Sequence, residues 1–171
     1  MILDVYWEKE LRTSIRLLKF WKRVSIVFDT EYVMHKLNKH ILFMAVAVRK
    51  AIDDDLWAKK ECEYSHSLMP ELPLINCKIS VTEYPFIGDK GWIPPGRISA
   101  GNYGKDSGER EILLNKLCSQ IIHSFVWGFA GTLGKRGFTF FGVASDYEKD
   151  KLVYYVNIED WIAAMRRCLE G

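Results

Sequence analysis

The chain has 171 residues, of which 49% are hydrophobic and 27% are charged, and its formal net charge is +2. These values are ordinary for a globular protein and predict one domain with a sizeable core. A net charge so close to zero does not by itself indicate a strongly polyanionic partner.

Cysteine spacing and hydropathy exclude further classes of protein. The four cysteines are too scattered for a secreted disulfide framework: Cys62, Cys77, Cys118 and Cys168. Cys62 and His66 lack the paired spacing of a zinc site, so no metal is expected, and no motif indicates a cofactor. Residues 1–28 contain no signal-peptide cleavage region, and the uncharged run 41–48 is too short to span a bilayer. We therefore expect a cytoplasmic protein without a membrane partner.

The first predicted helix runs from about Leu3 to Val27, with Leu11 and Leu18 on its apolar side and Phe20 widening that side. Five cations repeat at steps of three and four residues along the opposite side: Lys9, Arg12, Arg16, Lys19 and Arg23. Such a stripe is typical either of a solvated face or of a surface that contacts nucleic-acid phosphates. The nearly balanced charge of the chain favours the solvated face.

A second helix is predicted from Asp29 or Thr30 to about Trp57, where consecutive aspartates mark its exit. An insertion follows over residues 59–105, which contain all five prolines of the chain. Within it, the alternating pattern of residues 75–84 predicts one strand. We expect this strand to pair with a C-terminal hairpin, because an isolated hairpin is marginal in water.

The stretch from Glu109 to Gly128 is predicted to be the central helix of the domain. Its apolar residues recur at helical spacing and form a core-facing stripe: Leu114, Cys118, Ile121 and Phe125. The adjoining stripe is mostly polar: Lys116, Ser119, Gln120, His123 and Trp127. His123 is either a partly buried structural histidine that hydrogen-bonds a neighbouring helix, or a site histidine with Ser119 and Lys116 within two turns. Spacing alone favours the structural histidine.

The remaining residues predict a hairpin and a last helix. Residues 138–145 and 152–156 are rich in aromatic and β-branched side chains, which is typical of strands. Asn157 then caps a final helix from Ile158 to Leu169. Residues 1–171 are thus expected to form a single α+β domain. Its main part is a mostly helical bundle of about four helices, with a small antiparallel sheet formed by the hairpin and the strand of the insertion.

Three segments together resemble a set of uncharacterised bacterial proteins: Ala47–Ile52, Leu117–Phe125, and the hairpin with Ser145-Asp146 and Tyr154-Tyr155. The segment from Leu117 to His123 is also similar to the motif of the HEPN superfamily of helical ribonucleases and nucleotide-binding proteins. In that motif an arginine and a polar residue precede a histidine on a bundle helix near a dimer interface. Aligned on His123, the polar position falls at Ser119 and the arginine position falls at Cys118, so the arginine is missing.

This resemblance implies a non-catalytic HEPN-like binding or interaction module, homodimeric and associated with bacterial defence. Its binding residues are expected among the polar stripe and the five cations of the first helix. The alternative is a metal-independent ribonuclease in which His123 manages protons and Arg49 or Lys116 replaces the missing arginine. A third interpretation is a small-molecule or nucleotide pocket between the bundle and the 59–105 insertion. RNA, a nucleotide and a second copy of the chain are therefore the expected partners.

Overall fold

A computed structural model describes residues 5–24, 30–65, 74–88, 96–97, 103–131 and 137–170 of the chain. Within them the elements follow this order: α1 (Val5–Val24), α2 (Thr30–Ser65), β1 (Lys78–Pro85), β2 (Gly96–Arg97), β3 (Glu109–Leu113), α3 (Leu114–Ile122), β4 (Ser124–Ala130), β5 (Phe140–Ser145), β6 (Leu152–Asn157) and α4 (Ile158–Glu170). None of the helices within these residues has the length and apolar character needed to cross a membrane.

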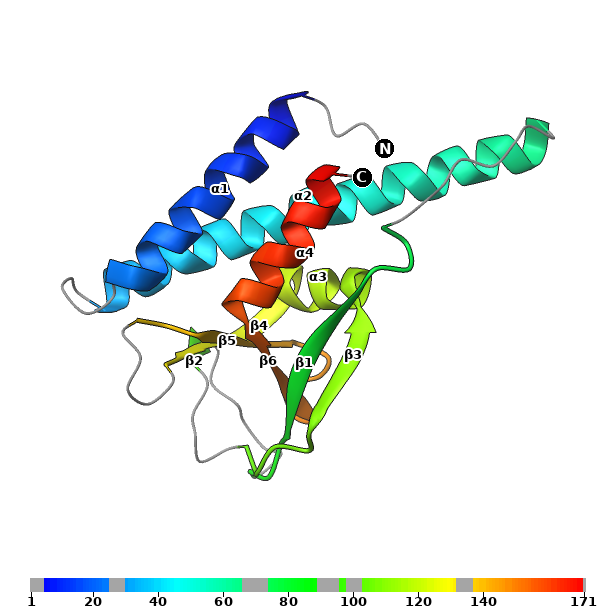
Figure 1. The fold of residues 1–171 in the computed structure, drawn as a ribbon. Helices are drawn as coiled ribbons and strands as arrows, with labels where there is room; N and C mark the ends of the chain where they lie inside the picture. The colour runs from blue at the N-terminus through cyan, green and yellow to red at the C-terminus, as the bar shows by residue number, and fades with distance from the viewer. Residues whose placement is uncertain are drawn as a thin grey trace.

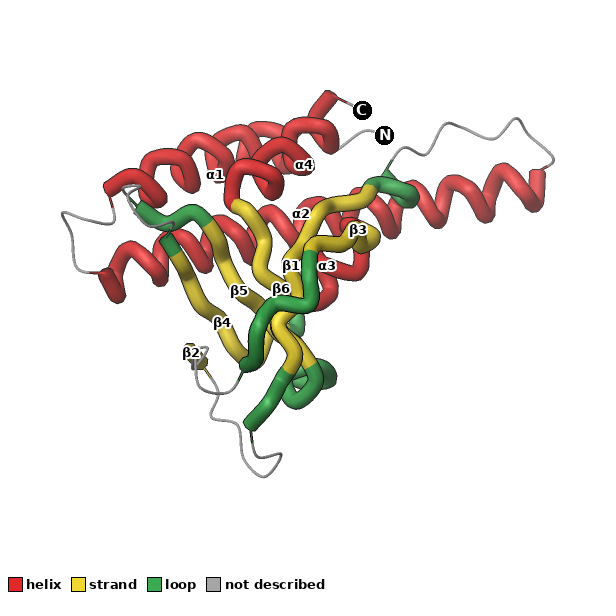
Figure 2. Tube along the Cα trace, turned by 60° about the horizontal axis from the view of Figure 1, so that its bottom comes forward, coloured by secondary structure: helices red, strands yellow, loops and turns green. Residues whose placement is uncertain are grey.

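The described helices all lie on one side of a six-stranded sheet (Figures 1 and 2). The strand order is β2-β4-β5-β6-β1-β3, and every neighbouring pair is antiparallel except β2 with β4. α1 and α3 pack against α2, while α4 packs against β1 and β6. The class is therefore α+β, as expected. The sheet is broader than the small one expected, and the described helices lie on one side of it.

The main core lies among the helices and between them and the sheet. Leu11 and Leu18 of α1 and Leu37 of α2 are fully buried in it. Trp7 stacks on Phe43, with ring centroids 5.5 Å apart. Each fully buried leucine contributes about 1.5–3 kcal/mol relative to an exposed one. α1 is thus fixed by its apolar side, which leaves its basic side facing solvent.

The predicted pairing of the insertion strand with the C-terminal hairpin is confirmed. β1 runs antiparallel to β6, with Glu83 opposite Tyr154, and β5 and β6 form the expected hairpin. The predicted cap of the last helix is also present, because Asn157 Oδ1 accepts a hydrogen bond of 2.9 Å from the Glu159 N–H. The sheet is larger than expected, because β2, β3 and β4 join it as well.

The prediction of a single helix from Glu109 to Gly128 is wrong. Only the nine residues Leu114–Ile122 are helical, and this helix lies between β3 and β4. The helical pattern holds within the nine residues, where these side chains are buried: Leu114, Leu117, Cys118, Gln120 and Ile121. On either side the backbone pairs with distant strands, β3 with β1 and β4 with β5. Those partners are remote in sequence, so local periodicity did not reveal them.

α2 continues to Ser65 and does not end near Trp57 as predicted. Two of the aspartates expected at its exit are paired one turn back instead, Asp53 with Arg49 at 3.1 Å and Asp54 with Lys50 at 3.0 Å. Ion pairs between residues four apart support a helix, so the acidic run does not terminate it. The C-terminal part of α2 projects beyond the other elements (Figures 1 and 2).

Candidate functional site

The basic stripe of α1 borders an open groove between α1 and α4. The groove has a volume of about 580 Å³, and its lining combines two apolar residues with five cations: Ile15, Phe20, Arg12, Arg16, Lys19, Arg23 and Arg166. Four of these cations come from the predicted stripe, and Arg166 comes from α4. α4 therefore forms a second side of the groove, whose other cations the sequence placed on a single helix.

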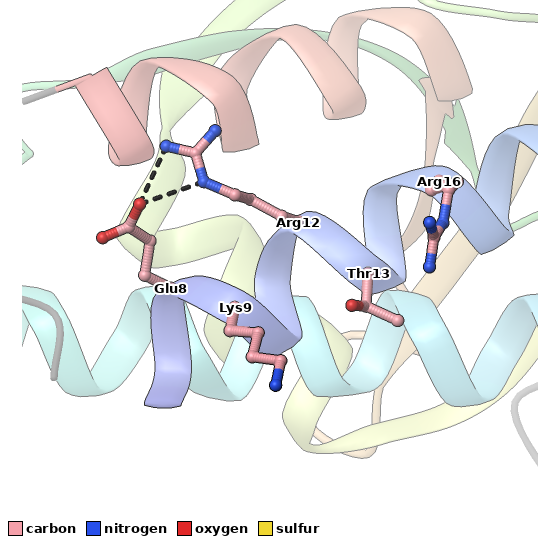
Figure 3. Close-up of a pocket in the computed structure, with 5 residues that line it drawn as sticks. All are labelled: Glu8, Lys9, Arg12, Thr13 and Arg16. Atoms are coloured by element: carbon pink, nitrogen blue, oxygen red, sulfur yellow. Dashed lines mark hydrogen bonds and ion pairs between the residues drawn. The ribbon is translucent and has the colours of Figure 1, made fainter. Parts of the chain in front are cut away.

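A second depression continues the groove toward the N-terminal end of α1. Its volume is about 480 Å³, and it is lined by Glu8, Lys9, Arg12, Thr13 and Arg16 (Figure 3). Figure 3 shows the Arg12 side chain extending toward α4, with the Glu8 carboxylate beside its guanidinium. The two side chains pair at 2.8 Å. All five cations of the predicted stripe thus border one continuous basic surface.

Electrostatics favour an anion in this groove. Among the described residues, no acidic side chain lines the part bordered by Arg166. Two acidic groups beside it already have partners, because Glu8 pairs with Arg12 and Glu159 pairs with Lys22. The hydrogen bond from Lys22 lowers the pKa of the Glu159 carboxyl, and the positive charges of Lys22, Lys19 and Arg23 lower it further. Glu159 is therefore already charged and partnered, and the other cations retain an excess of positive potential.

Phe20 departs from its predicted position. The sequence placed it on the apolar side of the first helix, but the side chain is 51% exposed and lines the groove. It meets Trp21 edge-to-face, with ring centroids 5.1 Å apart. Trp21 in turn packs against the main core. An exposed aromatic ring among cations is the combination that nucleic-acid-binding grooves use for bases and phosphates.

The motif residues of α3 are brought next to Arg49, a contact that the sequence left open. The Arg49 guanidinium donates a hydrogen bond of 2.6 Å to the Ser119 hydroxyl. Ser119 donates in turn to the Asn115 carbonyl at 3.1 Å, and Arg49 also pairs with Asp53. A cation from another helix thus lies beside Ser119. It is already partly neutralised by a carboxylate.

The prediction that His123 is partly buried and hydrogen-bonded through its side chain is wrong. His123 is exposed at the C-terminal end of α3. Its backbone N–H bonds the Ser119 carbonyl at 3.0 Å, and its carbonyl accepts from the Asp146 N–H at 3.2 Å. Within the described parts of the chain its ring has no hydrogen-bond partner, and the side-chain bonds of Arg49 go to Ser119 and Asp53 instead. The residue ends a short helix, because the chain turns directly into β4.

The other two candidates on α3 take part in packing. Gln120 is buried, and its side-chain oxygen accepts a hydrogen bond of 3.0 Å from the Ser145 N–H. Lys116 reaches the sheet, where its Nζ lies 3.8 Å from Glu148 and 5.5 Å from the Tyr154 ring centroid. The neighbouring Tyr154 side chain raises the pKa of Lys116, and the Glu148 charge adds to that shift. Both side chains therefore tie α3 to the β5–β6 hairpin.

Cys118 and Cys168 offer no reactive thiolate. Cys118, which occupies the arginine position of the motif, is fully buried, and burial raises the pKa of its thiol. Burial likewise raises the pKa of Cys168 to about 12. A thiol with a raised pKa is a poor nucleophile near neutral pH. The side chain of Cys62 and all of His66 lie outside the described residues.

Sequence reasoning missed Arg166 and Phe20 as members of the groove. Arg166 is exposed on α4, whose apolar face is buried. Helical periodicity could place it on the polar side of that helix, but only the packing of α4 beside α1 brings it to the stripe. Comparison of the chain with protein-family models, with curated proteins and with solved structures found no match in any of the three.

Proposed function

We propose that this protein is a non-catalytic module that binds nucleic acid by its phosphates in the basic groove between α1 and α4. The observation that carries the proposal is the convergence of five cations from two helices on one groove. Arginine supplies several donors in a planar fork that matches phosphate oxygens, and four of the five cations are arginines. The HEPN-like resemblance fits the same proposal, because that superfamily includes RNA-directed and nucleotide-binding proteins.

A salt series tests the proposal. Labelled RNA of mixed sequence is titrated with the protein, and binding is followed by fluorescence anisotropy. Counterion release predicts that log K falls linearly with log salt, with a slope of about −3.5 to −4.5 for five phosphate contacts. No binding at low salt would instead mean that the groove is solvated surface.

Matched charge variants locate the contact. The first variant replaces three groove cations with glutamine: Arg16, Lys19 and Arg166. The control replaces three exposed lysines that do not line the groove: Lys60, Lys105 and Lys151. Both change the net charge equally. We expect the groove variant to reduce the slope by about 2–3 units, because each lost contact removes about 0.7–0.9. Equal losses in both variants would show non-specific attraction.

A second candidate function, a metal-independent ribonuclease, is favoured by the contact between Arg49 and Ser119. In this proposal Arg49 stabilises the charge of the cleavage transition state and His123 transfers protons. The test is degradation of RNA in the presence of a chelator by the wild type, by Arg49→Met and by His123→Ala. Cleavage by the wild type that both variants lose would establish the enzyme. The exposed ring of His123 and the pairing of Arg49 with Asp53 lead us to rank it below the binding module.

A further inference from the structure

The aromatic ring in the basic groove bears on whether the ligand is a single strand or a duplex. Phe20 is 51% exposed, and it shares the lining with Arg16 and Arg23 of the same helix. Trp21, which packs against the core, contacts Phe20 edge-to-face at an interplanar angle of 76°. An anchored neighbour of this kind limits the movement of the Phe20 ring while leaving half of its surface accessible.

A ring in this position has a use only if the ligand offers the flat face of a base. In a duplex the faces of the bases are covered by their stacked neighbours, and proteins contact mainly phosphates, sugars and base edges. In a single strand the bases are free to stack on aromatic side chains, while cations follow the backbone. The combination of Phe20 with Arg16 and Arg23 matches the single strand.

The geometry of the cations points the same way. The stripe from Lys9 to Arg23 runs along one side of one helix, over about 21 Å at 1.5 Å per residue. Arg12 and Arg16 line both depressions, so the basic surface is continuous along that line. One line of cations with a ring near its end follows one phosphate backbone.

Resting on the proposed function, we infer that the ligand is single-stranded nucleic acid and that one unpaired base stacks on Phe20. The cations of the groove contact the phosphates on either side of that base. Because every base has a π face, this contact tolerates many sequences. RNA and DNA share the chemistry that the groove recognises, and the experiment distinguishes them.

Four probes of equal length separate the contributions: single-stranded RNA, single-stranded DNA, the corresponding RNA duplex, and inorganic polyphosphate, which has charge but no bases. We expect one or both single strands to bind more tightly than the duplex and the polyphosphate. The stronger of the two strands identifies the source of the ligand. Equal affinity for all four probes would overturn the inference but would leave the proposed phosphate-binding function standing. No binding of any probe at low salt would overturn both.

Variants at Phe20 test the stacking directly. Base–aromatic stacking predicts that Phe20→Ala weakens single-strand binding by about 5- to 150-fold and leaves polyphosphate binding unchanged. Phe20→Leu retains apolar volume without a π face and should show a similar loss. Tyr147→Ala is the matched control, because Tyr147 is 78% exposed in the turn between β5 and β6 and lies outside the groove lining.

A second readout follows the base itself in the complex with the wild-type protein. A strand that contains 2-aminopurine loses fluorescence when that base stacks. We expect the emission to fall when the strand binds the wild-type protein and to fall less with Phe20→Leu. Tight single-strand binding with unchanged emission at every labelled position, together with unaltered affinity in both Phe20 variants, would overturn the assignment of Phe20.

Discussion

The Arg49 guanidinium donates a hydrogen bond of 2.6 Å to the Ser119 hydroxyl, and so joins α2 to α3 across 70 residues of sequence. The Ser119 hydroxyl in turn donates a hydrogen bond to the Asn115 carbonyl, one turn earlier in α3. A charge-assisted hydrogen bond of this kind is stronger than a neutral one. It fixes the short helix α3 against the long helix α2, and it gives the polar position of the motif a structural role.

A double-mutant cycle measures this contact. The variants are Ser119→Ala, Arg49→Met and the pair, and the free energy of unfolding is obtained from urea denaturation. We expect a coupling energy of about 1 kcal/mol, because Arg49 is partly solvated and the contact is only part-buried. The ion pair of Arg49 with Asp53 is lost whenever Arg49 is replaced, whether residue 119 is serine or alanine. Its contribution therefore cancels in the coupling energy. A coupling energy near zero would mean that the contact does not stabilise the fold.

His123→Ala should leave the stability of the protein almost unchanged. The side chain is exposed and bonds its neighbours only through the backbone. Surface substitutions of this kind usually change stability by less than about 0.5 kcal/mol. Thermal melting of the wild type and the variant checks this. A loss of about 1–3 kcal/mol, the usual cost of an orphaned buried hydrogen bond, would restore the structural role that the sequence indicated.

The stability of the protein should fall as the pH drops below the pKa of an unperturbed histidine. His40 Nδ1 lies 3.4 Å from the Ser14 hydroxyl, and burial, with the charges of Lys39 and Lys36, lowers the pKa of His40. The unfolded chain, with a histidine pKa of about 6.5, therefore binds the proton more readily than the folded protein. The stability that depends on neutral His40 is fully present above about pH 6.5 and is lost as the pH falls toward the lowered pKa.

Melting curves between about pH 7.5 and pH 5.5 measure this effect. His40→Gln cannot take up the proton, so its melting temperature should depend less on pH across this window. His35→Gln is the control, because His35 lies on the exposed side of the same helix. Identical pH profiles for the wild type and His40→Gln would refute the assignment.

Removal of the cap of α4 should destabilise the protein measurably. Asn157 accepts the Glu159 N–H at 2.9 Å, which satisfies one of the free donors at the start of the helix. Loss of such a cap costs about 0.5–2 kcal/mol, so Asn157→Ala should lower the melting temperature by roughly 2–4 °C per kcal/mol in a chain of this size. Asn157→Asp keeps the acceptor and should melt close to the wild type. Equal losses in the two variants would show that the cap itself contributes little.

The sequence predicted those elements whose signals are local. Asn157 with its helix, the β5–β6 hairpin and most of α1 were found from capping residues, strand composition and helical spacing. The stretch from Glu109 to Gly128 was not, because β3 and β4 are defined by pairing with strands distant in sequence. In β3 only Ile112 is buried, so this edge strand has almost no alternating pattern to detect.

For the candidate site, too, the sequence predicted the local feature but not the part that depends on tertiary packing. The spacing of the cations on the first helix identified the stripe, since a helical face depends only on local geometry. Its conversion into a groove depends on Arg166, which tertiary packing alone brings beside α1. The net charge of the chain did not indicate a nucleic-acid surface, because acidic residues elsewhere balance a basic patch that is concentrated in space.

The order of the strands has a consequence for synthesis of the protein. β6 lies between β5 and β1 near the middle of the sheet, but β1 is made more than sixty residues before it. At about 5–20 residues per second, the nascent chain carries β1 for several seconds before its partner β6 emerges. We expect α1 and α2 to pair first, since their contacts are close in sequence. The sheet then closes in one late step once residues 140–157 have left the ribosome, and until that moment the inner edge of β1 is open to chaperones and to other nascent chains.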